Sequence, residues 1–178
     1  MIAPKKSLGQ HFLRDENIAR KIVEHLHPEN QDVLVEIGPG TGALTKHLVG
    51  RGKAFAAIEV DARALEVLRG RFADAEFVHS DVLGVRLDLL SKKYGDKLRI
   101  VGNIPYYITS EILFWLFDAR EAVRDAILMM QLEVAQRLIA KPRTKEYGIL
   151  SVFSQFYSSP ELLFQVSKNS FFPKPNVD

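Results

Sequence analysis

The stretch VLVEIGPGTG at residues 33–42 decides the fold of this chain of 178 residues. Its first five residues are mostly apolar and have the length and composition of a buried strand, and three glycines at alternate positions follow. Glycine lets the backbone turn sharply and lets a ligand approach without a Cβ in the way. A buried strand that runs into a glycine loop and then a helix is typical of the ligand-binding turn of a doubly wound α/β fold.

Strands and helices are predicted to alternate along the chain on both sides of this stretch. Short apolar runs predict strands at residues 33–37, 54–60, 76–79, 98–101, 126–130 and 162–166. Apolar residues at helical spacing predict helices that start after Asp15 and near Leu44, over 61–72, from Thr109, and over 131–140 and 148–158. Such alternation implies right-handed βαβ units and therefore an α/β fold, a mostly parallel sheet with helices on both faces. Ligands of such sheets bind at the carboxyl ends of the strands.

Composition excludes several classes of protein. Hydrophobic residues make up 47% of the chain and charged residues 26%, which excludes a disordered protein. The absence of cysteine excludes a disulfide scaffold, a thiolate metal site and a cysteine nucleophile. No apolar run reaches the ~18 residues that a membrane span needs, so we expect a cytoplasmic protein of one domain. His25 and His27 have no supporting cluster of acids or cysteines, so they indicate a helix end rather than a metal site.

Basic residues gather in two places, although the net charge is only +2. The N-terminal segment up to Arg14, predicted to be an irregular arm, also holds Lys5 and Lys6 and contains no acid. A second group, with Arg143 and Lys145, lies later in the chain. Local basic groups of this kind can contact the phosphates of a nucleic acid. Charge alone favours the simpler interpretation, a solvated arm and a solvated loop.

Acidic side chains stand at the ends of three predicted strands. Glu36 precedes the glycine loop, Glu59 lies near the end of the second strand, and Asp81 follows the third. A carboxylate at Glu36 would repel a pyrophosphate and attract a cationic ligand, which argues against a nicotinamide dehydrogenase. An acid at the position of Glu59 accepts hydrogen bonds from the ribose hydroxyls of an adenosine ligand, and Asp81 is placed to accept one from the adenine amino group. Two incidental surface acids beside a structural turn are the alternative.

The tetrapeptide Asn103-Ile104-Pro105-Tyr106 follows the predicted strand at 98–101. It fits the chemistry of a planar amino nitrogen, such as the exocyclic nitrogen of adenine, whose lone pair is delocalised into the ring. The side-chain oxygen of Asn103 and the carbonyl of Ile104 would draw this nitrogen toward tetrahedral geometry, while Pro105 fixes the backbone. Tyr106 offers a face on which a flipped base can stack. An ordinary Asn-x-Pro turn is the alternative.

These motifs together resemble a known family, the small-subunit ribosomal RNA adenine dimethyltransferases. That family belongs to the Rossmann-like S-adenosylmethionine-dependent methyltransferases (class I). The resemblance spans nearly the whole chain and keeps the family's order of motifs. It is carried by residues 6–13 (KSLGQHFL), 36–42, Glu59, Asp81, 103–106, 131–134 (QLEV), 147–152 (YGILSV) and 171–178 (FFPKPNVD).

The resemblance implies roles for individual residues. His11 and Leu13, from the N-terminal arm, would contact the cofactor, S-adenosyl-L-methionine. Phe171 would close the base pocket opposite Tyr106, and Asn103 would lie beside both the methyl group and the target nitrogen. The implied cofactor residues are His11, Leu13, Glu36, Gly38, Gly40, Gly42, Glu59, Asp81 and Asn103. The implied catalytic residues are Asn103, Ile104, Pro105, Tyr106 and Phe171, and we expect Lys5, Lys6, Arg14, Arg143 and Lys145 to contact RNA. No metal is expected.

The resemblance also implies an activity. The family transfers two methyl groups to each of two adjacent adenines near the 3′ end of small-subunit ribosomal RNA, so the small subunit is the expected partner. Two alternatives stay open. One is the antibiotic-resistance type of methyltransferase, which acts on large-subunit ribosomal RNA and shares the Asn-x-Pro-Tyr motif. The other is a ribosome-assembly factor whose catalysis is incidental.

The family further implies how the chain continues. Its members extend beyond Val177-Asp178 into a last strand of the sheet and a small helical domain. We therefore expect residues 1–178 to form a catalytic core without these parts. In this fold the last strand inserts between the two strands that precede it, so its absence would leave two unpaired edges and exposed apolar surface. Such a core is expected to recruit a strand from a neighbouring chain and form a strand-exchanged oligomer.

Overall fold

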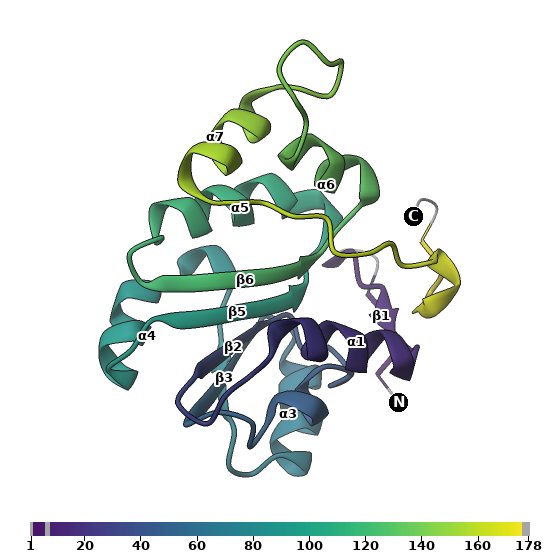
Figure 1. Ribbon diagram of the computed structural model, residues 1–178. Coiled ribbons are helices and arrows are strands. Elements are labelled where there is room, and N and C mark those ends of the chain that lie inside the picture. Colours follow the sequence, from purple (N-terminus) through teal and green to yellow (C-terminus); the bar gives the residue numbers. More distant parts are fainter. Residues whose placement is uncertain (1, 6–7, 176–178) are drawn as a thin grey trace.

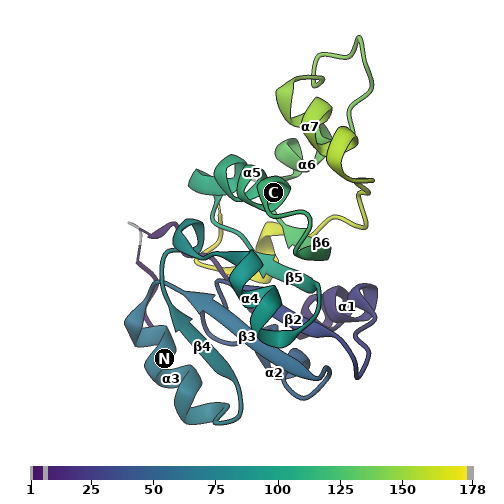
Figure 2. The ribbon, with the colours of Figure 1, turned by 90° about the vertical axis from the view of Figure 1, so that its left-hand side faces the viewer.

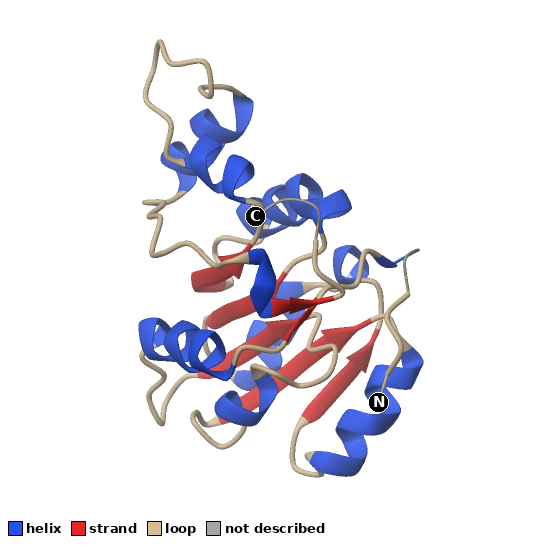
Figure 3. Cartoon of the chain, turned by 90° about the vertical axis from the view of Figure 1, so that its right-hand side faces the viewer, coloured by secondary structure: helices blue, strands red, loops and turns tan. Residues whose placement is uncertain are grey.

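The computed structural model describes residues 2–5 and 8–175 of the chain. Five strands form one parallel sheet, in the order β4-β3-β2-β5-β6 (Figures 1 and 3). They are β2 (Val33–Ile37), β3 (Ala54–Glu59), β4 (Glu76–His79), β5 (Leu98–Asn103) and β6 (Val123–Met129). The strand order reverses between β2 and β5, whose carboxyl ends lie side by side. Open α/β sheets bind their ligands at such a point.

Helices cover both faces of the sheet (Figure 2). They are α1 (Glu16–Leu26), α2 (Thr45–Leu48), α3 (Ala62–Arg71), α4 (Leu87–Tyr94), α5 (Thr109–Asp118), α6 (Leu132–Leu138) and α7 (Ile149–Tyr157). Leu34 of β2 belongs to the core shared with α1, α2 and α3, and its neighbour Val35 belongs to the core shared with α4 and α5. Successive side chains of a strand point to opposite faces. Glu36 therefore points, like Leu34, toward α2, where it meets Thr45.

Local sequence signals set the ends of the first helix. The carboxylate of Asp15 accepts hydrogen bonds from the backbone N–H groups of Asn17 and Ile18, at 3.0 and 3.3 Å, and so caps α1. The helix ends at His27, which takes a left-handed conformation with φ 46°. His27 thus ends a helix, as predicted. Across residues 2–5 and 8–175, no cluster of three or more His, Asp or Glu side chains is placed to hold a metal ion.

The prediction that the N-terminal arm is irregular is wrong at its end. β1 (Phe12–Leu13) pairs antiparallel with β7 (Phe171–Phe172), with Phe12 opposite Phe172. The N–H of Arg14 extends this pairing by donating to the carbonyl of Ser170 at 2.8 Å. A strand of two residues is too short to show a periodic pattern, and its partner comes from the opposite end of the chain.

The strand predicted at residues 162–166 is also wrong. The segment 158–167 passes beside β6 without pairing with it, and β6 is an edge of the sheet (Figure 1). Leu162 and Leu163 stay exposed. An apolar run becomes a strand only where a neighbouring strand takes up its backbone hydrogen bonds, and within the described residues no strand pairs with this segment.

Helix α4 has no clear signal in the sequence and was not predicted. This helix of 8 residues buries only Leu87 and Leu90, which are too few for a helical period to stand out. Among the helices of the described chain, each is too short or too polar to cross a membrane.

Candidate functional site

A cavity of about 220 Å³, here called the motif cavity, lies at the carboxyl ends of β2, β3, β4 and β5. The turns after these strands and residues 8–12 of the N-terminal arm line it. Six of the nine predicted cofactor residues contribute to its wall, namely His11, Gly38, Gly40, Glu59, Asp81 and Asn103. Four of the five predicted catalytic residues do so as well, namely Asn103, Ile104, Pro105 and Tyr106. The structure thus brings together residues from both predicted motifs.

The glycine loop takes backbone conformations that side chains disfavour. Gly38 and Gly40 have φ angles of 62° and 53°. A Cβ on Gly40 would lie 2.9 Å from the ring of Phe12, so the N-terminal arm packs directly on the loop. The N–H of Gly38 donates to the carbonyl of Ile58 at 2.9 Å, which joins the loop to β3. The wall of the cavity is therefore bare backbone held in a fixed shape, which a ligand can approach closely.

Glu59 is fixed at the foot of the glycine loop. Its side chain is buried, and one carboxylate oxygen accepts from the N–H of Gly40 at 3.1 Å. The other oxygen accepts from the N–H groups of Val60 and Asp61, both at 2.9 Å. Burial raises the pKa of Glu59, and the three backbone hydrogen bonds act against this rise. The result is a rigid acceptor that faces the cavity.

Three predicted cofactor residues lie behind the wall of the motif cavity rather than in it. Leu13 is buried in the core beside α1. Gly42 packs on α3, because a Cβ there would lie 2.9 Å from Leu68. Glu36 is only 1% exposed and accepts a hydrogen bond from the hydroxyl of Thr45 at 2.7 Å. These residues support the cavity from behind.

Burial governs the electrostatics of Glu36. It raises the pKa of this carboxyl to about 8, and the negative charge of Glu59 adds to the rise. The sequence analysis took Glu36 as a carboxylate that attracts a cationic ligand. A pKa of about 8 favours the protonated form at neutral pH and so weakens any ionic attraction from Glu36. The strand alternation described above is the cause, since it points Glu36 into the core.

Asn103 is the last residue of β5 and is half-buried. Its amide nitrogen donates to the backbone carbonyl of His11 at 2.9 Å. The ring of His11 stacks on Tyr106, with centroids 5.7 Å apart and planes 20° apart. Asp81 lies exposed at the rim of the cavity, where its carboxylate accepts from the N–H of Leu83 at 3.0 Å. Because the amide nitrogen of Asn103 faces the His11 carbonyl, the amide oxygen of Asn103 is turned away from His11.

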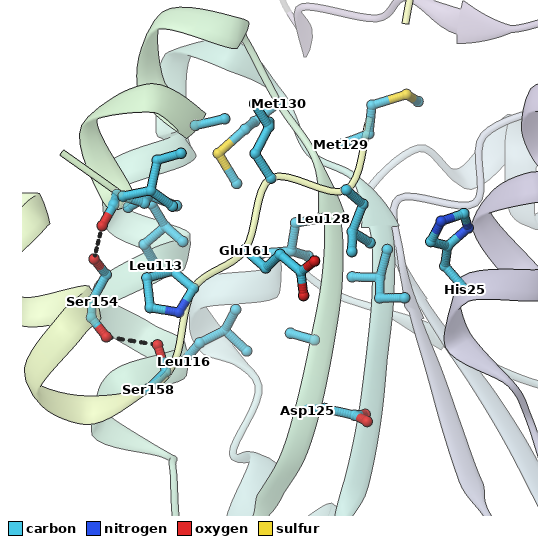
Figure 4. Close-up of a pocket in the computed structure, with 18 of the residues that line it drawn as sticks. His25, Leu113, Leu116, Asp125, Leu128, Met129, Met130, Ser154, Ser158 and Glu161 are labelled. Carbon is cyan, nitrogen blue, oxygen red and sulfur yellow. Dashed lines mark hydrogen bonds between the residues drawn. The ribbon is translucent and has the colours of Figure 1, made fainter. Parts of the chain in front are cut away.

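The fifth predicted catalytic residue, Phe171, lies outside the motif cavity. It is buried, and together with Tyr106 it lines a larger hollow of about 950 Å³ between β6 and the segment 158–167, here called the β6 groove. Figure 4 shows apolar side chains such as Leu128 and Met130 along this groove. The two cavities meet at Tyr106, which lines both.

The predicted RNA-contacting residues fall into two separate places. Lys5 is exposed, and its ammonium lies 3.9 Å from the buried carboxylate of Asp61, while Lys6 lies outside the described residues. The exposed Arg14 places its guanidinium 3.9 Å above the ring of Phe172. These residues belong to the arm that lines the motif cavity. The other two, Arg143 and Lys145, are exposed in the loop between α6 and α7, at the top of Figure 1.

Sequence reasoning missed the part played by Gln10. Its amide nitrogen donates to the carboxylate of Asp61 at 3.0 Å, and its amide oxygen accepts from the N–H of Lys5 at 2.8 Å. Arg63 holds the pKa of Asp61 well below its usual range, so this carboxylate stays charged as an anchor. No spacing rule links Gln10 to an acid on a different strand end.

The fold is that of the Rossmann-like methyltransferases. The chain is similar to a dimethyladenosine transferase from Plasmodium falciparum, with a TM-score of 0.85 and 28% identity over 94% of this chain and 60% of that one. It is also similar to the 23S rRNA methyltransferase ErmE, with a TM-score of 0.77 and 30% identity over 94% of this chain and 66% of that one.

Sequence comparison narrows the class to a family. The family described as ribosomal RNA adenine dimethylase matches residues 2–178, and the chain belongs to it. It is 46% identical to the ribosomal RNA small subunit methyltransferase A of Chlorobium luteolum, over 99% of this chain and 64% of that protein. The protein of the same name from Salinibacter ruber is 46% identical over 98% of this chain and 59% of its own length. The chain therefore spans about three fifths of the length of these relatives, and the resemblance found in its motifs is confirmed.

Proposed function

We propose that this chain is the catalytic part of an S-adenosylmethionine-dependent enzyme that dimethylates adenines of small-subunit ribosomal RNA at N6. The observation that carries the proposal is the position of Asn103, whose amide is held at the mouth of a cavity built by the glycine loop and Glu59. The relatives named ribosomal RNA small subunit methyltransferase A and the solved dimethyladenosine transferase support it.

The residues of the motif cavity fit S-adenosyl-L-methionine. Gly38 and Gly40 offer bare backbone to the ligand, and the carboxylate of Glu59 offers a fixed acceptor for ribose hydroxyls. Asp81 at the rim offers a second acceptor for an adenine amino group. When bound, this cofactor supplies an electrophilic methyl group on a positively charged sulfur. The negative charges of Glu59 and Asp81 complement that positive charge.

Asn103 and Ile104 would prepare the target nitrogen. The Asn103 oxygen is turned away from His11, and the carbonyl of Ile104 follows directly in the chain. Two acceptors that take the two N–H bonds of an adenine amino group pull its lone pair out of conjugation and so raise its nucleophilicity. The proton on the methylated nitrogen leaves after transfer, so no general base with a shifted pKa is needed.

Tyr106 and Phe171 would hold the flipped base. Tyr106 stands where the motif cavity meets the β6 groove, and Phe171 lines the groove. Stacking on an aromatic side chain contributes ~1–3 kcal/mol per base. The basic residues Lys5 and Arg14 flank the motif cavity on the N-terminal arm and would contact the RNA backbone, and Arg143 and Lys145 would add a second contact.

The partner we propose is the small ribosomal subunit, and the proposed compartment is the cytoplasm, because the relatives' name refers to that subunit. Large-subunit RNA is the second candidate substrate. The similarity to a 23S rRNA methyltransferase, at 30% identity, favours it specifically. A ribosome-assembly factor with incidental catalysis would bind the subunit equally well after loss of Asn103.

Methyl transfer from labelled S-adenosylmethionine tests the function. The protein is incubated separately with undermethylated small and large subunits, and the nucleosides are identified by mass spectrometry. We expect dimethyladenosine in small-subunit RNA, reduced by about 10²–10³-fold in Asn103→Ala. Label in large-subunit RNA alone would select the second candidate. Transfer that survives in Asn103→Ala would contradict the proposed chemistry.

We further propose that residues 1–178 are a catalytic core that is completed by a further strand and a helical domain. The unpaired edge of β6 and the segment 158–167 support the further strand, since both lack a strand partner among the described residues. An edge of this kind recruits strands from other chains, so we expect a strand-exchanged oligomer. Light scattering during gel filtration measures the mass. A strictly monomeric protein with a high melting temperature would argue against both statements.

A further inference from the structure

His11 makes contacts with three parts of the site at once. Its carbonyl accepts from the amide nitrogen of Asn103 at 2.9 Å, and its ring lies over Tyr106 with centroids 5.7 Å apart. Its Nδ1 lies 2.7 Å from the carbonyl oxygen of Pro173. We infer that His11 is a positioning residue. The contacts of its side chain fix its backbone carbonyl against the amide nitrogen of Asn103, and this contact selects the amide orientation that directs the Asn103 oxygen toward the substrate. The inference rests on the proposed function.

The contact with the His11 carbonyl is selective for one orientation of the amide. A side-chain amide has a donor end and an acceptor end, and a carbonyl oxygen can pair only with the donor. Rotation of the Asn103 amide by half a turn would set two oxygen atoms against each other and leave the His11 carbonyl without its donor. The same rotation would present N–H groups to the N–H groups of the target amino nitrogen. The orientation seen here is therefore the productive one.

The ring of His11 is held by the C-terminal segment. A carbonyl oxygen cannot donate, so Nδ1 must carry the proton in the contact with Pro173. Pro173 follows β7 directly, and β7 pairs with β1, which begins at Phe12. The hydrogen bond from the His11 ring to Pro173 thus joins the arm to the C-terminal segment directly beside the β1–β7 strand pair. This fixes the backbone of His11 where its carbonyl meets Asn103.

The arm is also anchored on either side of His11. Gln10 is bonded to Asp61 at 3.0 Å, and the N–H of Arg14 to the carbonyl of Ser170 at 2.8 Å. If these anchors alone fixed the arm, the His11 side chain would be dispensable for the orientation of Asn103. Variants of His11 that keep one of its two contacts separate this explanation from ours.

Two substitutions divide the functions of the side chain. His11→Asn keeps an N–H donor near the place of Nδ1 and removes the ring, and His11→Phe keeps a ring over Tyr106 and removes the donor. We expect His11→Phe to lower kcat for methyl transfer by about tenfold or more while KM for the cofactor changes little. His11→Asn should stay within about threefold of the unmodified protein. His47→Phe makes the same exchange on α2, outside both the motif cavity and the β6 groove, and serves as the matched control.

Nuclear magnetic resonance of the protein labelled with ¹⁵N-asparagine gives a readout that does not need activity. The Asn103 side-chain signals are assigned by their absence in Asn103→Ala. We expect His11→Phe to move them toward the values of free side-chain amides and to speed their exchange with water, and His11→Asn to leave them in place. If the signals move in His11→Phe but no RNA is methylated by any form, the positioning role stands and the proposed function fails. Unchanged signals in His11→Phe would overturn the inference, and so would equal methyl transfer by both variants at the rate of the unmodified, active protein.

Discussion

The motif cavity and the β6 groove lie on either side of Tyr106 and differ in how they are held. In the motif cavity, Glu59 and Asn103 have backbone partners at 2.9 to 3.1 Å, and the arm packs on the glycine loop. Along the β6 groove, one strand edge and the segment 158–167 are left without strand partners within the described chain. The first region has its shape from contacts inside the described chain. The second contains an unpaired strand edge within the described residues, so substitutions should act differently in the two.

Glu36→Gln is expected to give the largest effect, because it removes a buried ionisable group behind the motif cavity. The pKa of Glu36 is raised from 4.5 to about 8. Between these values the folded protein holds a proton that the unfolded chain has lost, so the free energy of unfolding falls as the pH rises. The slope is ~1.4 kcal/mol per pH unit. Between about pH 5.5 and about pH 8, the free energy of unfolding of the unmodified protein should therefore fall by ~3 kcal/mol more than that of Glu36→Gln.

Urea unfolding of both proteins at the two pH values measures this difference. The other titrating groups are common to the two proteins, so the comparison measures Glu36 together with its interaction with the nearby charge of Glu59. Parallel pH profiles would mean that Glu36 is ionised in the folded protein, and the buried carboxyl would then act on the cavity through its charge after all.

Glu59→Gln should act on cofactor binding. The amide would place its N–H₂ group against backbone N–H donors that the carboxylate now accepts from, and it would lose the charge. We expect the Kd for S-adenosylmethionine, measured by calorimetry, to rise by about 10–100-fold. Asp81→Asn, at the exposed rim, should raise it less. An affinity within about twofold of the unmodified protein would remove Glu59 from the site.

These two acids also show what the sequence reveals and what it does not. The position of Glu59 was predictable, because a strand end after a glycine loop is a local pattern. The role of Glu36 was not, since the motif led us to read it as a charge in the site, whereas the alternation of β2 buries it beside Thr45. The contact between His11 and Asn103 joins an arm to a strand end, and no spacing rule predicts it. The apolar run at 162–166 was read as a strand because sequence patterns cannot show whether a partner is present.

Gly40→Ala tests how tightly the arm and the glycine loop fit. The new Cβ would lie 2.9 Å from Phe12 in a backbone with φ 53°, so we expect a loss of ~1–2 kcal/mol in the free energy of unfolding. Gly70→Ala, in the helix α3 with nothing within 4 Å of its Cβ, should instead stabilise by ~0.5–1 kcal/mol. Urea unfolding measures both. Equal changes in the free energy of unfolding for the two variants would show that Phe12 on the arm can move to accommodate a side chain on the glycine loop.

Phe156→Ala should have the smallest effect, because its side chain on α7 is mostly exposed and meets the neighbouring ring of Tyr157 at the surface. Phe156 is 78% exposed, so its truncation should change the free energy of unfolding by less than ~0.5 kcal/mol. Phe153, one turn earlier, packs on Phe114 with ring centroids 5.2 Å apart, and Phe153→Ala should cost ~2 kcal/mol. Thermal and urea unfolding of the two variants measure the contrast. A large loss from Phe156→Ala would mean that this face is covered in solution, and the contrast between the two regions would then not hold.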